Sequence, residues 1–202
     1  MDRASATQRR GRAFTGDLRE DWELERLSVQ GAAEAFGVPV RAGCGSGGMS
    51  VAVARGFAER VHARQVDERG EPYINHVGRV AAGVPLFARS VGWLHDVVER
   101  SSVDESVLLA AGASPDECLA LRLLIREEGV RSDDAYLEHV RVIALSAGVS
   151  GRIARAVKRA DLLDHVAHRA VCSGGWLPPY GAALVVLMMV SANSQDAGPA
   201  WW

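Results

Sequence analysis

Residues 150–170 read SGRIARAVKRADLLDHVAHRA and form the longest amphipathic segment of the chain. Apolar side chains recur there at helical spacing, at Ile153, Val157, Leu162 and Val166. Polar side chains recur at intervals of three, four and three residues, at Lys158, Asp161, His165 and His168. Residues three and four apart share one side of a helix, so the segment is predicted to be a long helix with a polar stripe beside its apolar face.

The same periodicity extends through most of the chain. Further helices are predicted over residues 51–66, 73–84, 87–100, 104–111, 114–128, 132–145 and 179–190. No alternating strand pattern of useful length and no internal repeat is present. The fold class is therefore predicted to be all-α, as a bundle of about seven to eight helices.

Capping residues place several of these helix boundaries. Ser114-Pro115-Asp116-Glu117 combines a Ser N-cap, a Pro in the first turn and a Glu at the capping-box position. Ser132, followed by two aspartates, is predicted to cap the next helix. Gly112 and Gly129 are expected to end the helices that precede them.

The first part of the chain differs from the rest. Residues 1–48 hold Arg-rich and acidic stretches, a short helix expected over about residues 17–36, and the run AGCGSGG at 42–48. We expect a flexible, poorly structured N-terminal extension over residues 1–48, one domain over 49–192 and a tail over 193–202. A length of 202 residues suits one well-cored domain with a leader.

Composition limits the partners and the location. The formal net charge of −2 gives no reason to expect a nucleic acid or an anionic membrane as partner. The longest apolar run, residues 182–190, is too short for a bilayer, which needs about 20 residues, and is expected to be a buried helix. The cysteines form neither a Cys-x-x-Cys pair nor a disulfide framework, so a cytoplasmic protein is expected; they are Cys44, Cys118 and Cys172.

Four residues form the main candidate site, and all are possible metal ligands. They are His76, the adjacent pair His95 and Asp96, and Asp161. Two imidazoles and two carboxylates suit a divalent ion such as Mn²⁺, Fe²⁺ or Zn²⁺. Four protein ligands on an octahedral ion leave positions for water and a substrate oxygen, so the site can polarise a phosphoryl group.

Residues at helical spacing from these ligands add candidate roles. Glu99 lies four residues after His95, so a helix would project both from one face, where the carboxylate can orient or deprotonate water. Lys158 and His165 flank Asp161 and are candidates to contact phosphate oxygens. A structural interpretation stays open for each: a lone histidine is usually a satisfied core residue, and the polar stripe can be a solvated face.

Three separated stretches follow one another in the order His … His-Asp … Asp. They are GEPYINH at residues 70–76, LHDVVE at 94–99 and VKRAD at 157–161, with His62 and Gln65 upstream. In this order they resemble the HD superfamily of metal-dependent phosphohydrolases over about residues 51–190. Within it the chain is most similar to the hydrolase domain of RelA/SpoT-type alarmone enzymes and their small single-domain relatives.

The resemblance implies a helical HD domain with a single metal ion, usually Mn²⁺, bound by His76, His95, Asp96 and Asp161. It also implies hydrolysis of the 3′-pyrophosphate of (p)ppGpp, with Glu99 helping the attack of water. Arg64 and Tyr73 lie within the matching motif and join Lys158 and His165 as candidate substrate-binding residues.

Departures from the family pattern bear on activity. The acidic residue that follows the family's Glu is Arg100 here, and the Arg-Lys pair of the alarmone hydrolases aligns with Asp67-Glu68. The family's Asn four residues past the last ligand is His165. An acidic pair beside the mouth of the site is expected to repel a bis-pyrophosphate unless a cation such as Arg64 or Arg69 compensates.

These observations favour an enzyme that hydrolyses a phosphoester or pyrophosphate bond of a nucleotide, with Arg100 in the catalytic site beside Glu99. The alternative, motivated by Arg100 and Asp67-Glu68, is a catalytically weakened HD module that binds metal and nucleotide as a sensor or interaction domain. A third interpretation is a helical domain without metal. Oligomeric state does not follow from the sequence.

Overall fold

The computed structural model describes residues 48–101, 103–126, 132–168 and 178–193. Within these ranges the chain is all-helical, which confirms the predicted fold class. The α-helices are α2 (Val51–Val61), α3 (Ile74–Gly83), α4 (Arg89–Leu94), α5 (Glu105–Ala110), α6 (Pro115–Leu124), α7 (Asp133–Leu145), α8 (Gly148–His168) and α9 (Tyr180–Asn193). A 3-10 helix, η1 (Leu86–Ala88), precedes α4, and an isolated bridge joins Val66 to Pro72.

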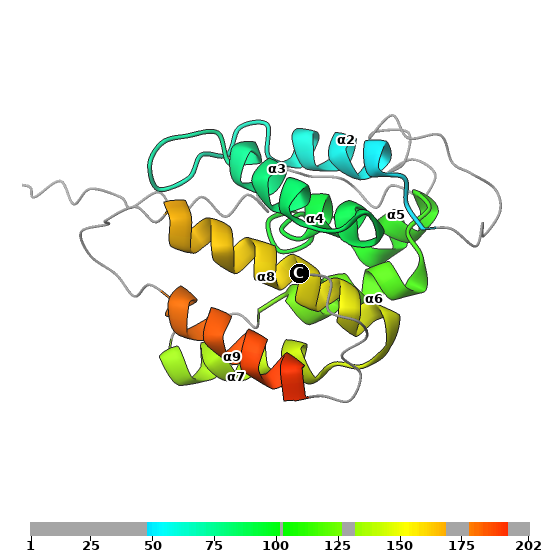
Figure 1. The fold of residues 1–202 in the computed structure, drawn as a ribbon. Coiled ribbons are helices and arrows are strands. Elements are labelled where there is room, and N and C mark those ends of the chain that lie inside the picture. The colour runs from blue at the N-terminus through cyan, green and yellow to red at the C-terminus, as the bar shows by residue number, and fades with distance from the viewer. Residues whose placement is uncertain (1–47, 102, 127–131, 169–177, 194–202) are drawn as a thin grey trace, which may run out of the picture.

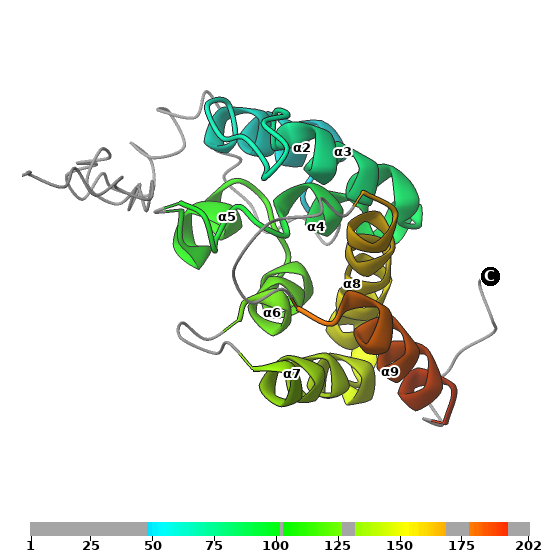
Figure 2. The same ribbon diagram turned by 90° about the vertical axis from the view of Figure 1, so that its left-hand side faces the viewer.

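The long helix α8 lies at the centre of the bundle. In Figure 1 it runs between the group α2, α3 and α4 on one side and the pair α7 and α9 on the other. Figure 2, from a perpendicular direction, shows the same order, with α6 beside α8 and α5 farther from it. Helix α8 contacts α3, α4, α6, α7 and α9, so a residue in its middle is within reach of several segments.

Apolar side chains from all these helices form one core. The face of α8 predicted to be apolar contributes Ile153, Val157 and Leu162, all buried, whereas Val166 of the same predicted face is exposed. Helix α4 adds Val91 and Leu94, which are fully buried. Burial of such side chains contributes about 1.5–3 kcal/mol each, and it holds α8 against its neighbours.

The predicted caps are present where the structure describes them. Ser114 and Glu117 form a reciprocal capping box at the start of α6, with Pro115 in the first turn. The Ser132 side chain accepts from the backbone N–H of Ala135 at the start of α7. Gly112 follows α5 with φ +98°, a conformation that favours glycine and ends the helix there.

One predicted helix is wrong over part of its length. Residues 87–100 were expected to form a single helix, but α4 ends at Leu94 and residues 95–100 form turns. The ring of His95 bonds through Nδ1 to the Gly92 carbonyl at 2.9 Å, the carbonyl that would accept from Asp96 N–H in a continuing helix. The bond from the His95 ring therefore competes with the helical bond from Asp96 N–H, and the helix ends at Leu94.

Other boundaries differ by several residues or lie outside the described ranges. Helix α2 ends at Val61 instead of residue 66, and α6 ends at Leu124, before the predicted end near residue 128. The expected helix over residues 17–36, the extension 1–48 apart from Gly48, and the tail 193–202 apart from the last residue of α9 lie outside the described residues. None of the described helices has the length and apolar character needed to cross a bilayer.

Candidate metal centre

The four predicted ligands meet at the contact of α3, α4 and α8. His76 lies in the first turn of α3, His95 is the C-cap of α4, and Asp161 lies in the middle of α8. All three are buried, at 5%, 6% and 7% exposure, and Asp96 follows His95 in the turn. Gly92 permits this approach, because a Cβ there would lie 3.1 Å from the Ala81 Cα of α3.

Ligand atoms of these residues converge at distances suited to a shared ion. The Nε2 atoms of His76 and His95 are 3.3 Å apart, and His95 Nε2 is 3.5 Å from Asp96 Oδ2. His76 Nε2 lies 3.6 Å from Asp161 Oδ1 and 4.0 Å from Asp96 Oδ2. Two sets of three ligands each fit within 4.8 Å and can hold a metal ion: His76–His95–Asp96 and His76–Asp161–His165.

Hydrogen bonds assign the tautomers of the two histidines. His76 Nδ1 lies 2.8 Å from Asp164 Oδ2, and His95 Nδ1 lies 2.9 Å from the Gly92 carbonyl. Both partners only accept, so each ring carries a proton on Nδ1 and has Nε2 left as the atom that can bind an ion. The two Nε2 atoms face each other 3.3 Å apart and lie close to the two carboxylates, an arrangement that a cation between them would stabilise. The donor set therefore fits a divalent ion.

Asp164 supports His76 and was missed by the sequence analysis. It is 8% exposed, and its carboxylate receives bonds from His76 and two from Arg79, at 2.6 and 3.0 Å. Burial alone would raise the pKa of Asp164, but the bonds from His76 and Arg79 outweigh it and lower the pKa. A carboxylate behind a ligating imidazole is a recurrent feature of metal sites. The signal in the sequence that could have identified Asp164 was its position three residues after Asp161 on the same helix.

Asp161 is held between two cationic or protonatable groups of α8. Lys158 Nζ lies 2.9 Å from Asp161 Oδ2, and His165 Nε2 lies 3.1 Å from Asp161 Oδ1. Burial would raise the pKa of Asp161, yet Lys158 and His165 lower it well below the usual value. Lys158 is itself 6% exposed, so this part of the stripe is not a solvated face.

Asp96 is oriented by Tyr73 and Arg100. The Tyr73 hydroxyl donates to Asp96 Oδ2, and Arg100 Nε lies 3.6 Å from the same oxygen. The Arg100 guanidinium also stacks on the Tyr73 ring, 4.1 Å from its centroid. Burial would raise the pKa of Asp96, but His95 and Arg100 outweigh it and keep the carboxylate ionised. Tyr73 therefore acts on a ligand, and its hydroxyl is already engaged.

An open pocket of about 550 Å³, including its mouth, lies over Asp96 and Asp161. Its walls come from the turn after α4 and from α6, α7, α8 and α9 as well as Tyr73, and the lining residues are Tyr73, His95, Asp96, Glu99, Arg100, Leu124, Arg126, Tyr136, Lys158, Asp161, His165 and Tyr180.

The predicted catalytic carboxylate lies in this pocket. Glu99 Oε1 is 3.5 Å from an Arg126 nitrogen, and both side chains are about one-third exposed, at 31% and 36%. The predicted reason was wrong, because residues 95–100 form turns and the shared face of a helix does not exist there. The turn nevertheless brings Glu99, Arg100, His95 and Asp96 into one pocket.

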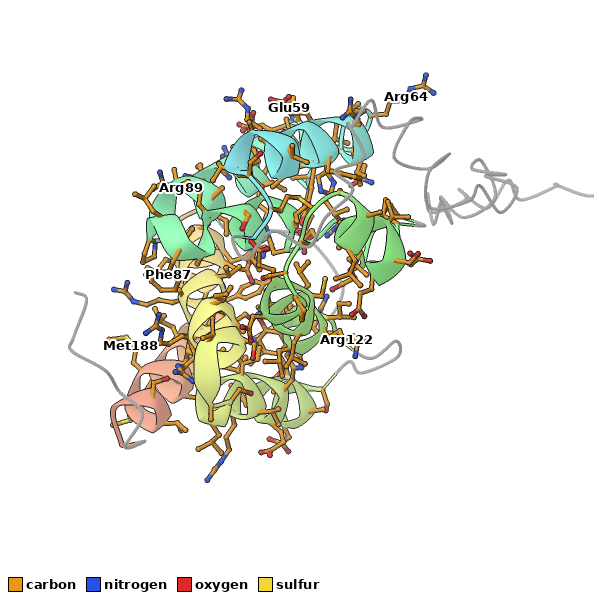
Figure 3. The ribbon with its side chains drawn as sticks, turned by 90° about the vertical axis from the view of Figure 1, so that its right-hand side faces the viewer. Glu59, Arg64, Phe87, Arg89, Arg122 and Met188 are labelled. Atoms are coloured by element: carbon orange, nitrogen blue, oxygen red, sulfur yellow. The ribbon has the colours of Figure 1, made fainter. Side chains whose placement is uncertain are left out.

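Arg64 and the acidic pair lie elsewhere. Arg64 is exposed and does not line the pocket, and Figure 3 shows its side chain pointing away from the bundle. Asp67 Oδ1 accepts from the backbone N–H groups of Arg69 and Glu71, at 2.8 and 2.9 Å, so it stabilises a turn. None of Asp67, Glu68 and Arg69 lines the pocket.

Residues of α6, α7 and α9 complete the site and were not predicted. Tyr180 stacks on His165 with ring centroids 4.3 Å apart and planes at 6°, and Tyr136 lies edge-on to Tyr180 at 6.1 Å. Arg126 follows α6 and adds a cation. No short motif links these positions to the ligands. Comparison with protein-family models and with curated proteins finds no match for the chain.

Proposed function

We propose that this chain is a metal-dependent phosphohydrolase of the HD type that acts on a nucleotide phosphate or pyrophosphate. The observation that carries the proposal is the convergence of two imidazole Nε2 atoms and two ionised carboxylates beneath an open pocket with cationic walls. The ligands are His76, His95, Asp96 and Asp161. Mn²⁺ is the proposed ion, following the family resemblance, and it accepts this mixed nitrogen and oxygen donor set.

When bound, such an ion polarises a phosphoryl group and acidifies a water molecule. The protein contributes hydrogen bonds that hold the side chains of the ligands in position. Asp164 and the Gly92 carbonyl accept from Nδ1 of His76 and His95, so the Nε2 atoms of both rings are aimed at the centre. Tyr73 donates to the carboxylate of Asp96, and Lys158 donates to that of Asp161, so both carboxylates are held in position. The ligands are thus prepared before substrate arrives.

Charged groups at the mouth suit a polyanionic substrate. Arg100 and Arg126 both line the pocket, and their exposed guanidinium groups can form charge-assisted bonds with phosphate oxygens. Asp67 and Glu68 do not line it, so a bis-pyrophosphate bound in the pocket would not contact the acidic pair directly. Guanosine 3′,5′-bis(diphosphate) is the leading candidate from the family resemblance, with loss of the 3′-pyrophosphate.

Proton transfer is assigned to Glu99. Its carboxylate lines the pocket near Asp96, where it can accept a proton from an attacking water. Arg100 cannot take this part, because a guanidinium stays protonated and its pKa is raised here by Tyr73 and Asp96 against the effect of burial. Arg100 is therefore assigned to binding phosphate and to orienting Asp96.

The proposal is tested with a metal-supplemented activity screen that includes (p)ppGpp and ordinary nucleotides and identifies the released phosphate. Wild-type protein with Mn²⁺ is expected to release phosphate or pyrophosphate, and Asp161→Asn is expected to abolish release. Asn is used because its amide oxygen can still accept a hydrogen bond from the buried Lys158, whereas a truncated side chain would leave no acceptor there. Circular dichroism checks that the variant is folded, and Asp134→Asn, an exposed aspartate of α7, is the control.

Arg100 favours a second candidate, a weakened module that binds metal and nucleotide as a sensor. A cation occupies a position where the related hydrolases carry an acid, and it contacts the ligand Asp96. The same screen separates the two candidates through Arg100→Asp. A large gain in hydrolysis favours the weakened module, whereas an unchanged or lower rate favours a working enzyme. No release from any metal-loaded substrate by the wild type contradicts the hydrolase.

A further inference from the structure

His165 lies among the ligand atoms of the candidate centre. Its Nε2 atom is 3.1 Å from Asp161 Oδ1, and its ring centroid is 4.8 Å from that of His76. Ligand atoms of His76, Asp161 and His165 all lie within 4.8 Å of one another, the same criterion that His76, His95 and Asp96 satisfy. His165 is thus placed as a ligand would be.

The two sets of ligands share His76, and this decides whether they describe one ion or two. His76 Nδ1 is engaged by Asp164, so the ring has one lone pair left, on Nε2. One imidazole lone pair binds one metal ion. The two overlapping sets therefore cannot hold two ions at once. In a single centre, His165 would lie on the side of Asp161 and His95 on the side of Asp96.

The orientation of the His165 ring is supported from α9. Tyr180 stacks on it face to face, with planes at 6° and centroids 4.3 Å apart. His165 lies one helical turn after Asp161 on α8, so both side chains leave the helix on the same side. Packing between α8 and α9 thus aims Nε2 at the centre, and the side chain is 34% exposed toward the pocket.

We propose that His165 is a fifth protein ligand of the metal, which makes the centre one of three imidazoles and two carboxylates. This inference rests on the proposed metal centre and deepens it, because it assigns His165 to binding the metal ion instead of the substrate. A third imidazole strengthens binding of borderline ions such as Co²⁺ and Zn²⁺. It also links α9 to the centre through Tyr180.

The test measures metal binding by the full chain without nucleotide. Wild type, His165→Asn and His168→Asn are stripped of metal and titrated with Co²⁺ in a calorimeter, and their visible absorption is recorded. His168→Asn is the matched control, because His168 lies on the same helix and contacts Asp164 instead of a ligand atom. His165→Asn is expected to weaken Co²⁺ binding by at least about 10-fold, since even the loss of a group behind a ligand costs that much.

The absorption bands of bound Co²⁺ are expected to shift in His165→Asn and to stay unchanged in His168→Asn. If folded His165→Asn protein keeps the Co²⁺ dissociation constant and spectrum of the wild type and only its KM for nucleotide is raised, His165 contacts the substrate and not the ion. That result would overturn the inference and leave the proposed hydrolase function intact. Failure of the wild type to bind Co²⁺ or Mn²⁺ would remove the metal centre itself, and the proposed function with it.

Discussion

At the scale of single residues, the two candidate ligand histidines differ in the group that accepts from their Nδ1 atoms. His76 and His95 are chemically alike, but one is backed by the Asp164 carboxylate and the other by a backbone carbonyl. A carboxylate partner makes the imidazole a stronger electron donor than a neutral carbonyl does. His76, which belongs to both sets of ligands, has the stronger support.

Asp164→Asn is expected to weaken Mn²⁺ binding about 10–100-fold, the usual effect of losing a group behind a metal ligand. The amide oxygen can still accept from His76 Nδ1, but the negative charge that makes the imidazole a better donor is gone. Arg79 also loses its ionised partner. Titration calorimetry of metal-free protein measures the change.

Asp116→Asn, at an exposed position in the first turn of α6, is the control for this variant. Equal Mn²⁺ affinity in Asp164→Asn and wild type would show that Asp164 only packs against Arg79 and has no influence on the centre.

At the scale of elements, the start of α6 fastens the beginning of the described domain to the bundle. The Glu117 carboxylate accepts from the backbone N–H groups of Met49 and Ser114, both at 2.8 Å, and from the Ser90 hydroxyl of α4. Glu117 is 5% exposed. A capping-box residue thus also joins α6 to α4 and to the residues just before α2.

Glu117→Ala is expected to lower the free energy of unfolding by at least about 3 kcal/mol, because three donors lose their acceptor and each buried unpaired group costs about 1–3 kcal/mol. Ser132→Ala removes an exposed cap at the start of α7 and is expected to cost about 1 kcal/mol. Urea unfolding of both variants gives the comparison. Similar losses in the two would mean that the contacts of Glu117 with Met49 and Ser90 do not stabilise the fold.

At the scale of the whole molecule, the candidate ligands come from three segments far apart in the chain. An ion bound by His76, His95 and Asp161 would join α3, α4 and α8, which carry them. Because the unfolded chain does not bring these residues together, metal binding is expected to favour the folded state.

Mn²⁺ at 100 times its dissociation constant is expected to stabilise the wild type by about 2.7 kcal/mol. For a chain of this length that corresponds to an increase in the melting temperature of about 5–10 °C. Calorimetry with and without Mn²⁺ measures the increase in wild type and in Asp161→Asn, each against its own metal-free protein. An equal increase in the two would place the bound ion outside the centre.

Local features of the sequence determined which segments form helices and where several of them begin. Periodicity predicted α8, and the caps Ser114 and Ser132 placed the starts of α6 and α7, because helix spacing and capping involve residues only a few positions apart. The four candidate ligands were also predicted from the sequence, because imidazoles and carboxylates are the donors that a divalent ion accepts.

Only the tertiary structure decided how these residues meet. The facing Nε2 atoms, the support from Asp164 and the stacking of Tyr180 on His165 depend on packing between helices distant in the chain. The placement of Arg64, which points away from the bundle instead of entering the pocket, was also decided only by the tertiary structure. Spacing along one helix specifies which side chains share a face, whereas the partner of that face is set by the packing of the whole core.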